Sequence, residues 1–131
     1  MFEGCHIRIA RPTDQLQKVS EFYELVLGFN RLSEFKNHEG FDGIMLGHSD
    51  APYHLEFTSH PDHQAGRSPS AEHLLVFYTG TDTRYREILG HLESRGVKSV
   101  KSHNPFWDRG GTTIEDPDGY RIVVFCGQWT A

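Results

Sequence analysis

The second half of the chain repeats the first half, and this duplication constrains the fold more than any other feature of the 131 residues. An offset of 67 residues aligns the segment YHLEF (53–57) with YRIVV (120–124), so that tyrosine meets tyrosine and apolar residues meet at the third and fifth positions. The same offset leads from His6 to His73, each of which opens a segment with a strand pattern. A tandem repeat of this length predicts two similar units that bury a face against each other or against a second chain.

Each half is predicted to contain one helix and four strands in the order β-α-β-β-β. In the first half, apolar residues recur at helical spacing from Leu16 to Leu27, with Thr13 or Asp14 as the N-terminal cap and Gly28 at the C-terminal end. The helix of the second half is expected to end at Gly96. The expected strands cover residues 5–10, 31–37, 43–48 and 53–59, and then 72–78, 97–101, 111–116 and 120–126.

The two halves are expected to form one domain, residues 1–131, because a chain of this length fits a single core. Module one covers residues 1–59 and module two covers residues 72–131. Between them, residues 60–71 have no apolar period and contain two prolines, a glycine and two serines, which is typical of a linker. Two histidines of this linker, His60 and His63, are expected to be solvated rather than to bind a metal.

Composition excludes several classes of function. The net charge is −5 and the 13 Lys and Arg residues are scattered, which argues against nucleic-acid binding. No apolar stretch approaches the roughly 20 residues that span a bilayer, and the first residues lack the basic and apolar regions of a signal peptide. Two cysteines are too few for a disulfide framework, so we expect reduced thiols and a cytoplasmic protein.

Two segments resemble a known superfamily. The segment HIRIARPTDQLQKVSEFYELVLGF (6–29) resembles the opening of a vicinal oxygen chelate module, and IEDPDGYRIVVF (114–125) resembles the closing strand pair of the second module. This superfamily contains the glyoxalases, the bleomycin resistance proteins and the extradiol dioxygenases. The resemblance implies an α+β fold in which two tandem βαβββ modules form a curved mixed sheet around a cavity for a small oxygen-rich molecule. It also implies a homodimer, and leaves open whether modules pair within one chain or across two.

The segment YHLEF (53–57) links this resemblance to a site. Strand alternation places Leu55 and Phe57 on one face and His54 and Glu56 on the other. The resemblance implies metal ligands at His6, Glu56 and His73, a set that suits Zn²⁺, Ni²⁺, Mn²⁺ or Fe²⁺. The fourth ligand position holds Val123, where the glyoxalase pattern has Glu. Glu56 and His54 are then the candidate catalytic groups, with His54 as a substitute base.

Other residues have two interpretations each. If the cavity holds no metal, His6, His73 and Glu56 are expected to hydrogen-bond one another. Arg8 and Arg121 either orient an anionic substrate or pair with carboxylates, with Glu56 as one candidate partner. Phe106 and Trp107 either form an aromatic wall for the substrate or pack over the end of a helix.

Two functions of different classes follow. The first is a metal-dependent lyase, isomerase or thiol transferase. The second is a metal-free binding protein that sequesters a small molecule, as the bleomycin resistance proteins do.

Overall fold

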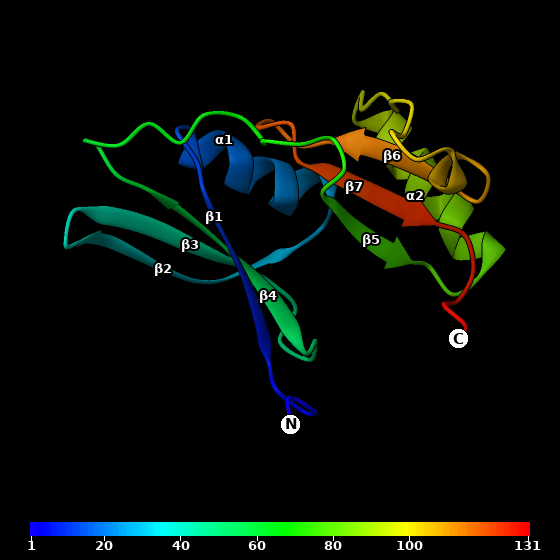
Figure 1. The fold of residues 1–131 in the computed structure, drawn as a ribbon, viewed down its shortest axis with the longest axis horizontal. Helices are drawn as coiled ribbons and strands as arrows, with labels where there is room; N and C mark the ends of the chain where they lie inside the picture. The colour runs from blue at the N-terminus through cyan, green and yellow to red at the C-terminus, as the bar shows by residue number, and fades with distance from the viewer. The chain divides into compact units, whose positions relative to one another are not determined.

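The computed structural model describes all 131 residues, which form two compact units, Met1–Gly66 (unit one) and Arg67–Ala131 (unit two). Each unit is a mixed sheet with one principal helix (Figure 1). The fold is therefore α+β, as the sequence predicts. None of the helices has both the length and the apolar character needed to cross a membrane.

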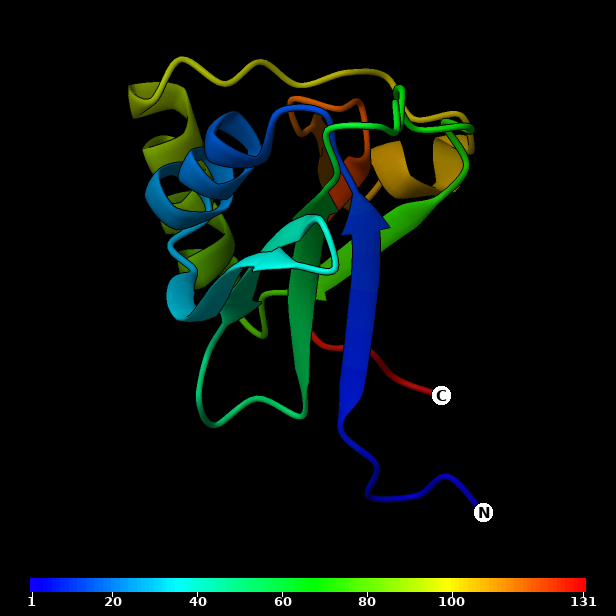
Figure 2. The same cartoon turned by 90° about the vertical axis from the view of Figure 1, so that its left-hand side faces the viewer.

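Unit one is a four-stranded sheet in the order β1-β4-β3-β2. Strand β1 runs parallel to β4, and Figure 2 shows the two side by side, whereas β3 is antiparallel to both of its neighbours. The strands are β1 (Ile7–Pro12), β2 (Asn30–His38), β3 (Phe41–Gly47) and β4 (Tyr53–Ser59).

The core of unit one lies between this sheet and its helix. Leu55 and Phe57 of β4 are almost fully buried, and the Tyr23 ring lies 4.9 Å from the Phe57 ring between centroids. Burying a side chain of this size stabilises the fold by about 1.5–3 kcal/mol. The predicted alternation along β4 is confirmed on this face, so His54 and Glu56 point to the opposite face of the sheet.

The first helix differs from the predicted continuous segment. Helix α1 (Leu16–Glu21) is followed by a short π-helix, η1 (Phe22–Val26), in which the Leu27 amide donates to the Phe22 carbonyl. The chain then leaves the helix at Gly28 with φ +73°, as predicted for a C-terminal glycine.

The predicted side-chain cap of the first helix is wrong. Gln15 occupies the N-cap position, and no side chain caps the helix there. The Asp14 carboxylate instead accepts hydrogen bonds from the Ala65 and Gly66 amides at the end of the unit. Thr13 Oγ1 accepts only from the Gln15 amide.

Unit two has a three-stranded sheet in the order β5-β7-β6, with β5 parallel and β6 antiparallel to β7. Tyr85 of the helix shares a hydrogen bond of 2.8 Å with Thr112 Oγ1, so the helix covers the sheet face that carries Thr112 and its partner Val124. The elements are β5 (Leu74–Tyr78), α2 (Asp82–Ser94), η2 (Pro105–Asp108), β6 (Gly111–Glu115) and β7 (Arg121–Phe125).

The predicted strand at residues 97–101 is wrong, because only an isolated bridge between Val100 and Thr113 forms there. Val97 and Val100 are three residues apart, so a strand would place them on opposite faces, and the other residues of the segment are polar. The following segment, expected to be a loop, contains the 3₁₀ helix η2. Unit two therefore has one strand fewer than unit one.

The two units also differ in strand register. A uniform offset of 67 residues would convert the pair Ile7–Tyr53 into Leu74–Tyr120, but Leu74 pairs with Arg121. The first strand of unit two is therefore shifted by one residue against its partner. A shift of one residue moves every side chain of a strand to the other face.

Candidate functional site

Three polar side chains gather on the sheet face of unit one that faces away from the core. Arg8 of β1 lies opposite His54 of β4 in the parallel pairing, and Glu56 follows two residues later on the same face of β4. The Arg8 Nε donates to His54 Nε2 at 2.8 Å, and Nη1 donates to Glu56 Oε2 at 3.2 Å. We call Arg8, His54 and Glu56, together with His6, the open-face cluster.

Exposure within the open-face cluster is uneven. The Glu56 side chain is only 14% exposed, whereas that of Arg8 is 48% exposed. The two hydrogen bonds leave the guanidinium in different directions, from Nε and from Nη1, and Nη2 forms no hydrogen bond within the chain. Nε and Nη1 of Arg8 are therefore held by the protein, whereas Nη2 is not.

His54 connects Arg8 to His6. Because His54 Nε2 accepts from Arg8, the neutral ring carries its proton on Nδ1, which donates to His6 Nε2 at 2.6 Å. Burial lowers the pKa of His54, electrostatic interaction with Arg8 and with His6 lowers it further, and Glu56 opposes them. His54 is thus a neutral ring whose two nitrogens are both engaged.

The predicted metal ligands of unit one do not fit a divalent metal as they stand. Nε2 of His6 is the acceptor of the His54 proton, and Glu56 is paired with the Arg8 cation. No group of three or more His, Cys, Asp or Glu side chains is placed to hold a metal ion. The positive charge in this cluster is supplied by the guanidinium.

The remaining predicted ligand positions lie in unit two. His73 is exposed and lies one residue before β5. Val123 is fully buried and pairs with Val76. Continued backwards, the alternation of β5 places His73 on the face opposite to Val123. A metal role for His73 stays a prediction.

Arg121 is engaged within unit two. Its Nε donates to Glu115 Oε2 at 3.2 Å and its Nη1 donates to the Lys101 carbonyl at 3.0 Å. Both candidate arginines are therefore paired with a carboxylate, Arg8 with Glu56 and Arg121 with Glu115. Only Arg8 keeps a large exposed fraction.

Phe106 and Trp107 pack on a strand rather than on the end of a helix. The Phe106 ring is parallel to that of Phe125 at 6.0 Å between centroids, and Trp107 stands nearly perpendicular to Phe125 at 5.7 Å. Phe106 remains half-exposed at the surface of unit two. A substrate-binding role for these two aromatics stays a prediction.

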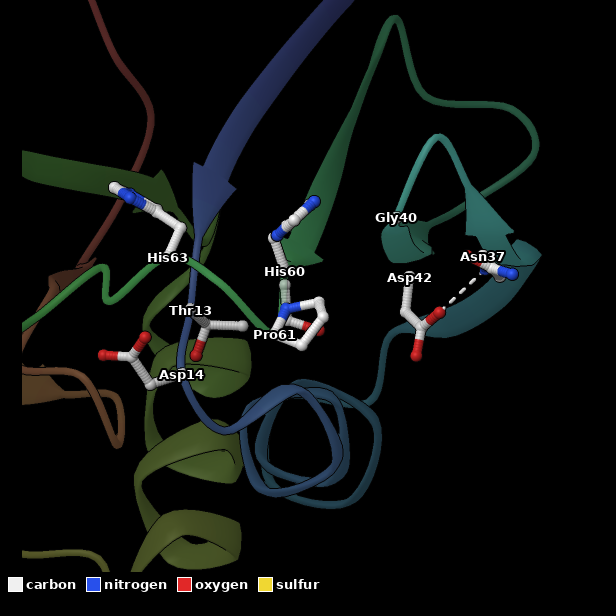
Figure 3. A pocket seen from close by; sticks show the side chains of 9 residues that line it. Thr13, Asp14, Asn37, Gly40, Asp42, His60, Pro61 and His63 are labelled. Atoms are coloured by element: carbon white, nitrogen blue, oxygen red, sulfur yellow. Dashed lines mark hydrogen bonds between the residues drawn. The ribbon is translucent and has the colours of Figure 1, made fainter.

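A pocket of about 540 Å³ lies at the other end of the unit-one sheet, where β1 and β4 end and the β2–β3 hairpin turns (Figure 3). Sequence reasoning assigned it no role. Several of its polar groups hold loops: Asp42 Oδ1 accepts from the Asn37 amide, and His60 Nδ1 accepts from the Asp62 amide. It is lined by Thr13, Asp14, Asn37, Gly40, Asp42, Ser59, His60, Pro61 and His63.

Each of the two units has a mixed sheet and a helix that follows its first strand. This pair of units defines a vicinal oxygen chelate fold. Solved structures support this assignment. Trypanothione-dependent glyoxalase I of Leishmania major superposes with a TM-score of 0.72 at 17% identity, covering 93% of this chain and 86% of that chain. TnmS3, an antibiotic binding protein from Streptomyces sp. CB03234, gives a TM-score of 0.64 at 21% identity, covering 95% of each chain.

Within this fold the chain belongs to the YycE-like family. Residues 7–58 match the YycE-like N-terminal domain and residues 72–125 match the YycE-like C-terminal domain. The uncharacterized protein YycE of Bacillus subtilis (strain 168) is 46% identical over 122 residues, which cover 93% of this chain and 88% of that protein. A crystal structure of a Bacillus subtilis YycE protein has a TM-score of 0.87 at 43% identity, covering 98% and 93% of the two chains.

Proposed function

We propose that this protein binds a small oxygen-rich anion on the open face of unit one, with Arg8 as the group that holds it. The observation that carries this proposal is the guanidinium of Arg8, which is held at Nε and Nη1 and unbonded at Nη2. A planar guanidinium recognises two oxygens at once through paired N–H groups. Because His54 and Glu56 already orient Arg8, little side-chain entropy is lost when a ligand binds.

Relatives of this fold support a binding role. TnmS3 binds an antibiotic, and the Bacillus subtilis YycE structure is described as a candidate glyoxalase or fosfomycin resistance protein. These descriptions agree with a small-molecule ligand, and they extend from binding proteins to enzymes. The open-face cluster favours the first kind, because His54 and Glu56 already accept hydrogen bonds from Arg8 without a divalent metal.

A metal-dependent lyase, isomerase or thiol transferase is the second candidate. One observation favours it: His6, just before β1, and Glu56 of β4 belong to the same cluster, as the family pattern requires. For a metal to bind them, His6 has to release the His54 proton, Glu56 has to release Arg8, and a third ligand has to come from outside unit one.

Two measurements on the purified protein decide between these functions. Elemental analysis of protein prepared without chelator or affinity metal is expected to show no stoichiometric metal. Thermal unfolding in a panel of small carboxylates, phosphates and phosphonates, fosfomycin included, is expected to reveal a stabilising ligand. At 100 times its Kd, such a ligand adds about 2.7 kcal/mol to the free energy of unfolding.

The matched control is Arg8→Met, which keeps the aliphatic length of the side chain and removes its charge. This variant is expected to lose the ligand-dependent stabilisation while it remains folded. One metal per chain that disappears in Glu56→Ala would instead establish the metal-dependent function. The absence of a stabilising anion from the whole panel would contradict the binding function.

We also propose that the protein acts as a cytoplasmic homodimer. Within unit one, β1 is an edge strand with β4 as its partner, and its Ile7 is 57% exposed. Edge strands with exposed apolar residues are commonly covered by another chain. Light scattering at micromolar concentration is expected to give twice the mass of one 15.0 kDa chain.

A further inference from the structure

We propose that the pocket at the far end of the unit-one sheet (Figure 3) binds a small hydroxylated molecule that carries a protonated amine. This inference goes beyond the proposed function, because the pocket is separate from the open-face cluster. Arg8 and His54 are the second residues of β1 and β4, whereas Thr13 of the pocket follows the last residue of β1. At about 3.3 Å per strand residue, the chain from Arg8 to Thr13 spans roughly 16 Å, so one small ligand does not occupy both sites.

The position and the size of the pocket suit a small ligand. The parallel strands β1 and β4 both end at it, because Thr13 follows β1 directly and Ser59 is the last residue of β4. Loops at the carboxyl ends of parallel strands commonly carry ligand sites. The cavity volume of about 540 Å³ lies within the range of about 300–1,000 Å³ that is usual for small-molecule sites. The pocket is therefore large enough for a molecule of the size of a monosaccharide.

Several side chains that line the pocket keep hydrogen-bonding groups that the chain does not use. Asp42 Oδ1 accepts from the Asn37 amide at 2.9 Å, as Figure 3 shows, but Asp42 Oδ2 accepts from no group of the chain. The side-chain amide of Asn37 and the hydroxyl of Ser59 form no hydrogen bond within the chain. His60 Nδ1 accepts from the Asp62 amide at 3.1 Å, so the neutral ring carries its proton on Nε2. The pocket therefore offers both donors and acceptors, which hydroxyl groups match in both roles.

The charge of the pocket sets the class of the ligand. Two carboxylates, Asp14 and Asp42, line it, and no Lys or Arg side chain does. The Ala65 and Gly66 amides and, to a smaller degree, electrostatic interaction with His63 lower the pKa of Asp14, so this carboxylate is ionised at neutral pH. The half-buried Asp42 carboxylate has an unused oxygen that can accept from an ammonium group. Hydrogen bonds of this kind are roughly twice as strong as those between neutral groups, so the pocket favours a cation over a neutral or anionic molecule.

The wall formed by the β2–β3 hairpin is held in place before any ligand binds. Gly40 has φ +88°, and a Cβ added there would collide with the His60 ring, so glycine leaves the room that this ring occupies. The His60 ring also packs edge-on against Phe41, at 4.7 Å between centroids. Because the hydrogen bond from Asn37 to Asp42 fixes the same hairpin, little conformational entropy is lost when a ligand binds to Asp42.

The test uses two pairs of probes that differ by one amine: D-glucosamine with D-glucose, and 2-amino-1,3-propanediol with glycerol. The wild-type protein is titrated with each probe at pH 7, and its ¹⁵N–¹H amide spectrum is followed. At least one amine is expected to shift the amide signals of Asn37, Asp42 and Ser59 to saturation, with an affinity about tenfold or more above that of its amine-free partner. Equal affinity within both pairs, or no saturable shift at these residues with either amine, would overturn the inference.

A matched pair of variants tests the role of Asp42. Asp42→Asn keeps an oxygen that accepts from the Asn37 amide and replaces the unused oxygen with an NH₂ group, so it is expected to weaken binding of the amine probe about tenfold. The control is Glu39→Gln, which removes a charge from the same hairpin at a residue that does not line the pocket. This control is expected to bind as the wild type does. Unchanged affinity in a folded Asp42→Asn variant, or an equal loss in both variants, would overturn the assignment, and the probe pairs decide it on the wild type if Asp42→Asn does not fold.

Discussion

The alternation of side chains along β4 predicts that substitutions at two neighbouring residues destabilise the fold to very different extents. Phe57 is 1% exposed and packs against Tyr23, so Phe57→Ala is expected to remove about 3–5 kcal/mol from the free energy of unfolding. Glu56 shares one hydrogen-bonded ion pair with a half-exposed arginine, so Glu56→Gln is expected to cost less than about 1 kcal/mol.

These magnitudes translate into thermal shifts. A protein of this size loses about 3–4 °C of Tm per kcal/mol, so Phe57→Ala lowers Tm by roughly 9–20 °C and Glu56→Gln by less than about 4 °C. Circular dichroism melts and urea titrations measure both changes, and an unchanged denaturant slope shows that the loss is one of stability. Phe57→Leu is the milder companion if Phe57→Ala does not fold. Equal destabilisation by the two neighbours, or a larger effect at Glu56, would refute the assignment of faces.

The remaining predictions concern stability. Ala65 and Gly66 amides lower the pKa of Asp14, so this carboxylate stabilises the fold above its ordinary pKa and the contribution disappears as pH falls through the lower folded value. Asp14→Asn should therefore lower Tm at pH 7 and flatten the decline of Tm below pH 4. Gly28→Ala meets no neighbouring atom but requires φ +73°, so urea unfolding should show a cost of about 1 kcal/mol. Val123→Glu places a carboxylate in a fully buried position, and should cost several kcal/mol and bind no metal in elemental analysis.

Structural features that are set by residues close together in the sequence were predictable from the sequence. The period of two along β4 sets which side chains are buried, and Gly28 and Gly96 end their helices with positive φ. The βαβββ order of unit one follows from the same local signals. The strand expected at residues 97–101 failed because its two valines share no face.

The chemistry of the site depended on pairings between distant strands. Arg8 and His54 meet because β1 and β4 pair in one particular parallel register, which no local pattern specifies. Glu56 was correctly named as a possible partner of an arginine. Only the register shows that this arginine is Arg8. The register also shows that His54 is the acceptor that orients Arg8.

A crystal structure of the wild-type protein grown with both oxalate and excess Zn²⁺ tests the central claim most directly. We predict oxalate oxygens within hydrogen-bond distance of Arg8 Nη2, with the Arg8 contacts to His54 and Glu56 intact. An anomalous zinc peak bound by Glu56 and by either His54 or His6, with Arg8 displaced, would contradict it.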